Sequence, residues 1–247
     1  MFKLLLTLFI LFHIIGDFYF QTDKISKKKN MQYKYVILHS IIYTTVFFVG
    51  SITIWSTQIV LVISILSVFH CIVDSLKYFY IKHINSPSKL SELALYSIDQ
   101  SLHITSFLIA AAFAACKGYD VSLLPWIENM LVAINLSGWA ALSWICILLI
   151  VCKPINISIK QMLVKYKPAQ TNNNASNNAG AFIGSLERII IALLLSVGQY
   201  SAIGLVLTAK SVARYDKISK DQIFSEYYLL GTLLSTLFVI IVFFIFM

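Results

Sequence analysis

Charged residues are scarce in this sequence. Aspartate, glutamate, lysine and arginine make up 12% of the 247 residues, and 59% of the residues are hydrophobic. Soluble domains, by contrast, carry about 25% charged residues. Apolar runs of about 20 residues recur from end to end, and each is long enough to cross the hydrocarbon layer of a bilayer. The composition therefore excludes an ordinary soluble domain and predicts an all-α, polytopic membrane bundle.

Several motifs of soluble proteins are also missing. There is no CxxC pair, and three of the four cysteines (Cys71, Cys116, Cys146 and Cys152) lie inside apolar runs, so we expect small buried side chains and no disulfide. The sequence has no nucleotide-binding glycine loop and no serine-hydrolase elbow. Its formal charge of +8 sits mostly in short loops. Because no basic patch stands apart from the apolar runs, nucleic acid is not expected as a partner.

The apolar runs predict six or seven membrane spans. They cover residues 2–20, 35–55, 58–80, 94–116, 130–152, 186–209 and 227–247. No small-x-small cleavage site follows the first run, so we expect that run to be a retained span rather than a signal peptide.

Lysines in the loops predict the orientation of the spans, because short cytoplasmic loops carry an excess of positive residues. The basic loops contain Lys24, Lys27, Lys28, Lys29 and Lys34 after the first span, Lys77, Lys82 and Lys89 after the third, and Lys153, Lys160, Lys165 and Lys167 after the fifth. The alternate loops, around 56–57 and 117–129, have one lysine between them. We therefore expect the basic loops in the cytoplasm and the N-terminus outside.

Three parts are predicted along the chain. Residues 1–152 form a membrane bundle, and residues 184–247 form C-terminal membrane helices. Between them, 153–183 is predicted as a flexible cytoplasmic linker, because "KPAQTNNNASNNAG" (Lys167–Gly180) is polar and low in complexity.

The run 186–209 allows two interpretations. If it crosses the membrane once, Lys210 and Arg214 fall outside, against the charge rule. If the chain turns at "GQYSAIG" (Gly198–Gly204), a re-entrant hairpin returns both residues to the cytoplasm. The sequence does not decide between these alternatives.

Polar residues inside the spans form a pattern. Three pairs of histidine and aspartate lie four residues apart: His13 and Asp17, His70 and Asp74, Asp99 and His103. Residues four apart share one face of a helix. Under the predicted orientation, the reversed order of the third pair puts every aspartate nearer the cytoplasm and every histidine one turn deeper. His39, early in the second span, falls near the same depth.

Ionisable residues within a span cost roughly 2.5–3.5 kcal/mol on insertion scales, so they are expected to pair or to bind an ion. Imidazole and carboxylate are common ligands of zinc and similar ions. The predicted metal ligands, for zinc or manganese, are His13, Asp17, His70, Asp74, Asp99 and His103. The predicted catalytic residues are Asp17, Asp74, Asp99, His39 and Lys77. Hydrogen bonds that hold the bundle together, or a proton or ion pathway, remain open alternatives.

Three residues flank these pairs. Lys77 lies one turn beyond Asp74, where its side chain either binds a phosphate or carboxylate or extends to the lipid headgroups. Gln21 continues the face of Asp17. Gln100, adjacent to Asp99, is expected to point to a different face.

The motifs "HIIGDFYFQTDKISKKK", "LHSIIYT", "FHCIVDSLK" and "DQSLH" together resemble the bacterial membrane family catalogued as domain of unknown function 3307. The resemblance covers about residues 5–115, and "IGSLERIIIALLLSVGQYSAIGLVLTAKSVARY" looks like an extension of longer members. It implies a multi-pass protein of the bacterial inner membrane and no established reaction.

Our first hypothesis is a membrane-embedded, metal-dependent hydrolase that acts at the cytoplasmic leaflet. Its expected partners are membrane lipids, with a lipid or lipid-linked phosphate as substrate. The alternatives are a proton- or ion-coupled transporter or channel, and a structural or partner-binding membrane protein.

Overall fold

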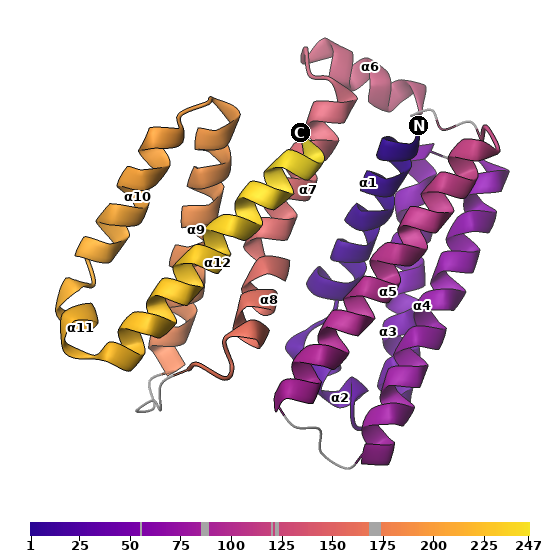
Figure 1. Ribbon diagram of the computed structural model, residues 1–247. Helices are drawn as coiled ribbons and strands as arrows, with labels where there is room; N and C mark the ends of the chain where they lie inside the picture. The colour runs from indigo at the N-terminus through magenta and orange to yellow at the C-terminus, as the bar shows by residue number, and fades with distance from the viewer. Residues whose placement is uncertain (55, 85–88, 120, 122–123, 168–173) are drawn as a thin grey trace. The chain divides into compact units, whose positions relative to one another are not determined.

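The computed structural model describes residues 1–54, 56–84, 89–119, 121, 124–167 and 174–247, and this part of the chain is helical, without strands (Figure 1). The chain divides into two compact units, Met1–Cys146 and Ile147–Met247. Six of the described helical segments are long and apolar enough to cross a membrane. The predicted all-α membrane bundle is therefore confirmed.

Four long helices build the first unit, with short elements between them. In chain order the elements are α1 (Phe2–His13), the π-helix η1 (Ile14–Tyr19), α2 (Asp23–Lys29), α3 (Tyr33–Ser51), the 3₁₀-helix η2 (Ile52–Ile54), α4 (Thr57–Ile84), α5 (Lys89–Cys116), α6 (Pro125–Ala133) and α7 (Gly138–Cys152), within which the second unit begins. The helices α1, α3, α4 and α5 lie side by side, with α1 against α3 and α5, and α4 against α3 and α5 (Figure 1).

The core of this bundle differs between its two ends. At the end where α1 begins, the buried side chains are large and apolar, among them Leu5, Phe9, Phe47, Ile59 and Ile63. At the other end, the buried side chains include the predicted histidines and aspartates. The buried histidines and aspartates are thus confined to one half of the bundle, whereas the buried polar side chains of the other half include the hydroxyls of Thr7 and Ser51.

The predicted fifth span begins too early in the sequence. Residues 130–133 belong to α6, and Asn135 then takes a left-handed backbone conformation with φ of 53°. The next helix starts at Gly138, where the Ser137 hydroxyl accepts a hydrogen bond from the Ala140 N–H at 3.1 Å. The helix break at Asn135 and the serine cap together move the start of the span from 130 to 138.

The second unit contains a helical hairpin. Its elements after α7 are α8 (Pro154–Met162), α9 (Asn174–Ser196), α10 (Tyr200–Val212), α11 (Tyr215–Lys220) and α12 (Gln222–Phe246). The chain reverses direction between α9 and α10 at Gly198, whose φ of 71° suits a residue without a Cβ (Figure 1). Glu187 and Lys210, at nearly equal distances from this turn, form an ion pair across the hairpin. The backbone therefore follows the hairpin alternative for 186–209.

Part of the predicted linker is helical. Helix α8 and the first residues of α9 fall within 153–183, and residues 168–173 lie outside the described part of the chain. The flexibility of this segment and the three-part division stay predictions.

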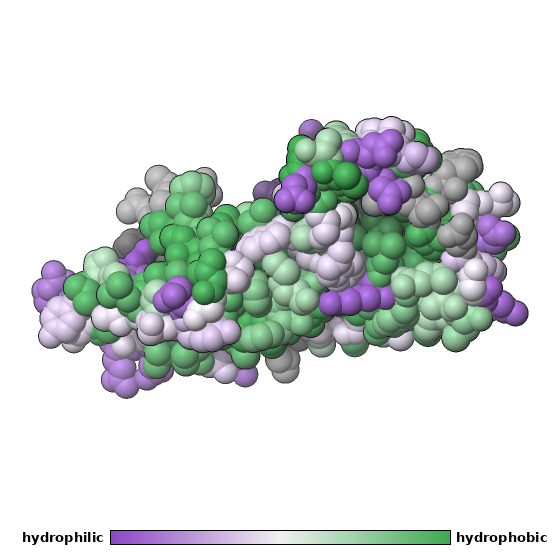
Figure 2. Space-filling view, turned by 90° about the horizontal axis from the view of Figure 1, so that it is seen from above, coloured by the Kyte–Doolittle hydropathy of each residue, from purple (hydrophilic) through white to green (hydrophobic). Residues whose placement is uncertain are grey.

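Apolar side chains are abundant on the surface. Figure 2 shows hydrophobic residues over much of the face that it presents, with hydrophilic residues in separate groups. Large apolar side chains that are more than half exposed include Ile41, Leu61, Ile65, Val68 and Leu76 on α3 and α4. A lipid environment accounts for such exposure, because apolar surface there is not in contact with water.

Candidate functional site

All seven predicted histidines and aspartates meet in one buried cluster within the first unit. They are His13, Asp17, His39, His70, Asp74, Asp99 and His103, and each is at most 6% exposed. They come from α1 and η1, from α3, from α4 and from α5. These side chains contact one another, as expected for residues that lie at one depth of the bundle.

Asp17 lies in a π-helical segment. The Phe20 N–H donates to the Ile15 carbonyl at 2.9 Å, an i to i+5 hydrogen bond that marks the π-helix. The neighbouring Gly16 permits a close approach to α3, since a Cβ at this position would lie 2.9 Å from Tyr43 Cδ2. Single π-turns within helices often occur at functional sites.

A chain of hydrogen bonds joins three helices to Asp17. The Tyr43 hydroxyl lies 3.2 Å from His13 Nδ1, and His13 Nε2 lies 3.2 Å from Gln100 Oε1. The Gln100 amide nitrogen donates to Asp17 Oδ2 at 3.0 Å. Since Gln100 Oε1 can only accept, His13 Nε2 donates and Nδ1 accepts from Tyr43. Both ring nitrogens of His13 are thereby used.

The first group of candidate ligands is Asp17, His39 and His70. Asp17 Oδ1 lies 3.1 Å from His39 Nε2 and 4.0 Å from His70 Nε2. One ligand atom from each residue falls within 4.8 Å of the others. Neither imidazole is aligned for a hydrogen bond, and all four of their nitrogens are buried without a hydrogen-bond partner among the described residues.

The second group is Asp74, Asp99 and His103, whose ligand atoms also lie within 4.8 Å of one another. Lys29 Nζ donates to both oxygens of Asp74, at 3.0 and 2.9 Å. Lys77 Nζ donates to Asp99 Oδ2 at 2.8 Å. The other oxygen of Asp99 lies 3.6 Å from His103 Nε2. Each carboxylate of this group thus has an ammonium partner.

Lys29 reaches the cluster from α2, outside the membrane-spanning segments, and is 7% exposed. Burial by itself lowers the pKa of this ammonium group, but the carboxylates of Asp74, Asp17 and Asp99 outweigh that effect and raise the pKa. Lys29 is therefore a charged counterion of Asp74.

Aromatic stacking orients two of the histidines. The His70 ring lies between the ring of Tyr43, with centroids 3.6 Å apart, and the ring of His103, with centroids 4.4 Å apart. Both pairs are nearly parallel, with an angle of 18° between the rings. Packing on both faces restricts rotation of the His70 ring.

Some predicted positions differ from what the spacing suggested. Gln100 was expected to point to a different face from Asp99, but its side chain contacts Asp99 as well as His13 and Asp17, because α1 packs against α5. Lys77 pairs with Asp99 rather than extending to the headgroups. His39, predicted as catalytic, joins the first ligand group, whereas His13 does not.

Sequence reasoning missed two members of the cluster. Tyr43 follows His39 by four residues, so its place on the same helix face was a usable signal. Lys29 had no comparable signal, because it is one of several lysines in a basic segment, and only the docking of α2 distinguishes it.

The donor set suits a divalent cation. Two imidazoles and one carboxylate, as in the first group, are the protein ligands of several catalytic metal sites, which keep a further position for water or substrate. A buried polar atom without a partner costs about 1–3 kcal/mol. A cation held by these atoms would supply the partners that they lack among the described residues.

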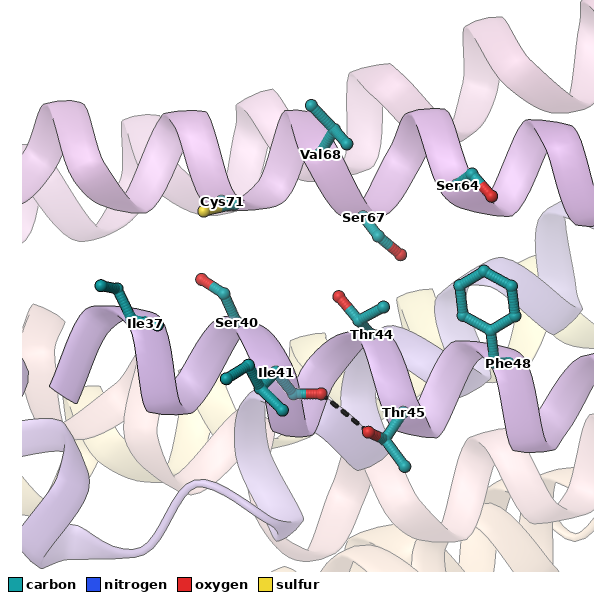
Figure 3. A pocket seen from close by; sticks show the side chains of 10 residues that line it. All are labelled: Ile37, Ser40, Ile41, Thr44, Thr45, Phe48, Ser64, Ser67, Val68 and Cys71. Carbon is teal, nitrogen blue, oxygen red and sulfur yellow. Dashed lines mark hydrogen bonds between the residues drawn. The ribbon is translucent and has the colours of Figure 1, made fainter. Parts of the chain in front are cut away.

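A groove between α3 and α4 is separate from this cluster. It has a volume of about 470 Å³ and is lined by Ile37, Ser40, Ile41, Thr44, Thr45, Phe48, Ser64, Ser67, Val68 and Cys71. In Figure 3, Ser40 and Thr44 on one helix and Ser67 on the other point into the space between them. None of the predicted site residues lines the groove, so it is not the candidate site.

Comparisons with known proteins add one finding. No curated protein and no solved structure matches this chain. The model of a family of proteins of unknown function, DUF3307, matches residues 5–133, which include the whole cluster and α6. Because this match spans more than half of the chain, the protein belongs to the DUF3307 family.

Proposed function

We propose that this protein is a membrane-embedded, metal-dependent hydrolase that acts at the cytoplasmic leaflet. The observation that carries this proposal is the buried cluster, in which imidazole and carboxylate atoms of α3, α4 and α5 lack hydrogen-bond partners among the described residues. A polar network that served only packing would be expected to satisfy its own members. A divalent cation, zinc or manganese, is the ligand that this donor set favours.

The residues divide into roles by their contacts. Asp17, His39 and His70 are the proposed cation ligands, and Asp74, Asp99 and His103 are the adjacent group of candidate ligands. When bound, such a cation acts as a Lewis acid and makes water a better nucleophile. Asp99 Oδ1, which has no hydrogen-bond partner among the described residues, is placed to accept a proton. Tyr43, His13 and Gln100 hold Asp17 in position.

The substrate is proposed to be a lipid or lipid-linked phosphate. Lys77 is the most exposed charged member of the cluster, with 20% of its side chain accessible, and can contact a phosphate as a point charge. The cluster lies at the end of the bundle that α2 borders, and α2 belongs to the lysine-rich segment predicted to face the cytoplasm. A substrate at the lipid–water boundary suits that depth.

The apolar half of the bundle counts against a transporter. A transport path needs polar groups along the whole route, whereas the core at the opposite end is built from side chains such as Leu5, Phe9 and Ile63. Ala111 and Ala114 of α5 are buried in the same half. The apolar core at this end therefore favours the hydrolase over the transporter.

The test measures metal content and hydrolysis on the same preparations. The full chain is purified in detergent without a metal-binding tag, and its metals are measured by inductively coupled plasma mass spectrometry. Phosphate release is then measured from phosphatidic acid in mixed micelles. The comparison variants are H70A/D74A, which removes two cluster residues, and K28A, a lysine of α2 that contacts Tyr35 outside the cluster.

We expect bound zinc or manganese and phosphate release in the wild type and in K28A, and neither in the folded double variant. A wild type that binds no metal, even after metal is added back, contradicts the proposal. Metal binding without phosphate release from phosphatidic acid, or from a lipid-linked phosphate assayed in the same way, contradicts the proposed hydrolase and leaves a metal site.

A further inference from the structure

The two groups of candidate ligands are adjacent but have different neighbours. His39 Nε2 lies 3.1 Å from Asp17 of the first group and 3.5 Å from Asp74 of the second. A site with two cations and a site with one are both conceivable for such a cluster. The positions of the nearby lysines distinguish between them.

In the first group, no ammonium group is found in contact with the carboxylate among the described residues. Asp17 is contacted by the imidazoles of His39 and His70 and by the Gln100 amide. His39 and His70 have buried nitrogens without hydrogen-bond partners in the described part of the chain. Since neutral imidazole offers one lone pair, each ring can supply one ligand atom.

In the second group, the carboxylates already have cationic partners. Lys29 binds both oxygens of Asp74, and Lys77 binds Asp99. Asp74, Lys29 and Asp99 are at most 7% exposed, so solvent screens these pairs little. A metal ion at this group would have to compete with Lys29, which occupies both oxygens of Asp74, and would leave the ammonium group of Lys29 buried without a partner.

We infer that the cluster holds one divalent cation, bound by Asp17, His39 and His70, and that the ammonium groups of Lys29 and Lys77 take the place of a second cation at Asp74 and Asp99. This inference rests on the proposed metal site but is independent of the reaction that the site performs. It also assigns Lys29 a role in setting the number of ions.

The first experiment counts ions per chain. The full-length protein is saturated with zinc or with manganese, freed of excess metal, and analysed by mass spectrometry for metal and protein content. We expect about one ion per chain in the wild type and about two in K29M, because Asp74 is then free of its ammonium partner. K28M is the matched control and should keep one ion, since Lys28 contacts Tyr35 rather than the cluster.

A second pair of variants locates the ion and does not depend on the folding of K29M. H39Q should reduce the bound metal to a small fraction of the wild-type amount, whereas H103Q should retain about one ion. Circular dichroism and size-exclusion chromatography establish that both variants are folded.

Each outcome bears on the inference. Two ions in the wild type, one ion in folded K29M, or loss of the ion in H103Q but not in H39Q would overturn it. No ion in the wild type would overturn both the inference and the proposed metal-dependent function. One ion at His39 without hydrolysis would overturn only the hydrolase.

Discussion

At the scale of single residues, the cluster depends on how each polar side chain finds partners inside an apolar bundle. Each ring nitrogen of His13 has a partner, whereas neither ring nitrogen of His39 has one among the described residues. From the sequence, His13 was predicted as a metal ligand because it pairs with Asp17, and His39, which has no such pair, was predicted as a catalytic residue. Their different contacts link His13 to Asp17 through Gln100 and leave His39 as a candidate ligand of the proposed cation.

The hydroxyl of Tyr43 is predicted to stabilise the fold through His13. In Y43F, His13 Nδ1 loses its donor at 3.2 Å while the ring stacked on His70 remains. A buried acceptor without a donor should lower the free energy of unfolding by about 1–3 kcal/mol. Thermal unfolding in detergent measures this, with Y33F as the control, because the Tyr33 hydroxyl contacts Ser75 at an exposed position. Equal midpoints for Y43F and Y33F would contradict the assignment.

Gly16 is predicted to set the spacing between η1 and α3. In G16A the new methyl group would lie 2.9 Å from Tyr43 Cδ2, so Tyr43 or the π-helix must shift. Overpacking of this kind typically costs about 1–3 kcal/mol. We expect a lower unfolding midpoint in detergent and weaker zinc binding by isothermal titration calorimetry. G204A, with no atoms near the added Cβ, is the control and should not be destabilised. Wild-type zinc affinity in G16A would show that this contact does not position the site.

At the scale of helices, buried side chains compensate for interrupted backbone hydrogen bonding. α7 ends at Cys152 and α8 begins at Pro154, which has no N–H to continue the helical ladder. Arg188 Nε donates to the Val151 carbonyl at 2.7 Å, and the Asn156 side chain donates to the Cys152 carbonyl at 2.7 Å. Polar side chains thus supply hydrogen bonds to backbone carbonyls at the point where the membrane helix is interrupted.

Arg188 is therefore predicted to be essential for the second unit. It is 2% exposed and also donates to Ser185, Asn156 and Ser235. R188L removes all these donors and should lower the free energy of unfolding by at least about 2 kcal/mol, because several buried acceptors lose their partners. Urea or thermal unfolding in detergent checks this. R214L, at an exposed position, should behave like the wild type, and equal stability of the two variants would contradict the prediction.

At the scale of the whole molecule, the six apolar helices need an orientation in the membrane. The lysine distribution predicts the end of α5 outside and the segment around α2 in the cytoplasm. Cys116 ends α5 and is exposed, which makes it a natural reporter.

A chain in which Cys116 is the sole cysteine should react with a membrane-impermeant maleimide in intact cells. A chain in which S26C is the sole cysteine should react only after the cells are permeabilised, because Ser26 lies on α2. Labelling is measured by the mass shift of the protein on a gel. The reversed pattern would invert the topology and place the candidate site at the outer leaflet.

The sequence by itself determined the helical membrane class, most of the spans and the seven histidines and aspartates of the cluster. Hydropathy follows directly from composition, and residues four apart share a helix face in any α-helix. Local signals of this kind do not depend on how the helices pack. Reliance on local hydropathy also explains why the start of the fifth span was predicted wrongly. The apolar run continues through Asn135, so hydropathy did not indicate the helix break there.

Only the tertiary structure decided which atoms meet. The π-turn at Asp17, the contact of Gln100 with His13 and Asp17, the stacking of Tyr43 on His70 and the pairing of Lys29 with Asp74 all join segments that are distant in the sequence or depart from α-helical geometry. These contacts depend on the rotation and separation of packed helices, which hydrophobic periodicity does not specify. For that reason the sequence predicted a shared polar layer, whereas the packing divided it into two groups of candidate ligands and paired the carboxylates of one group with lysines.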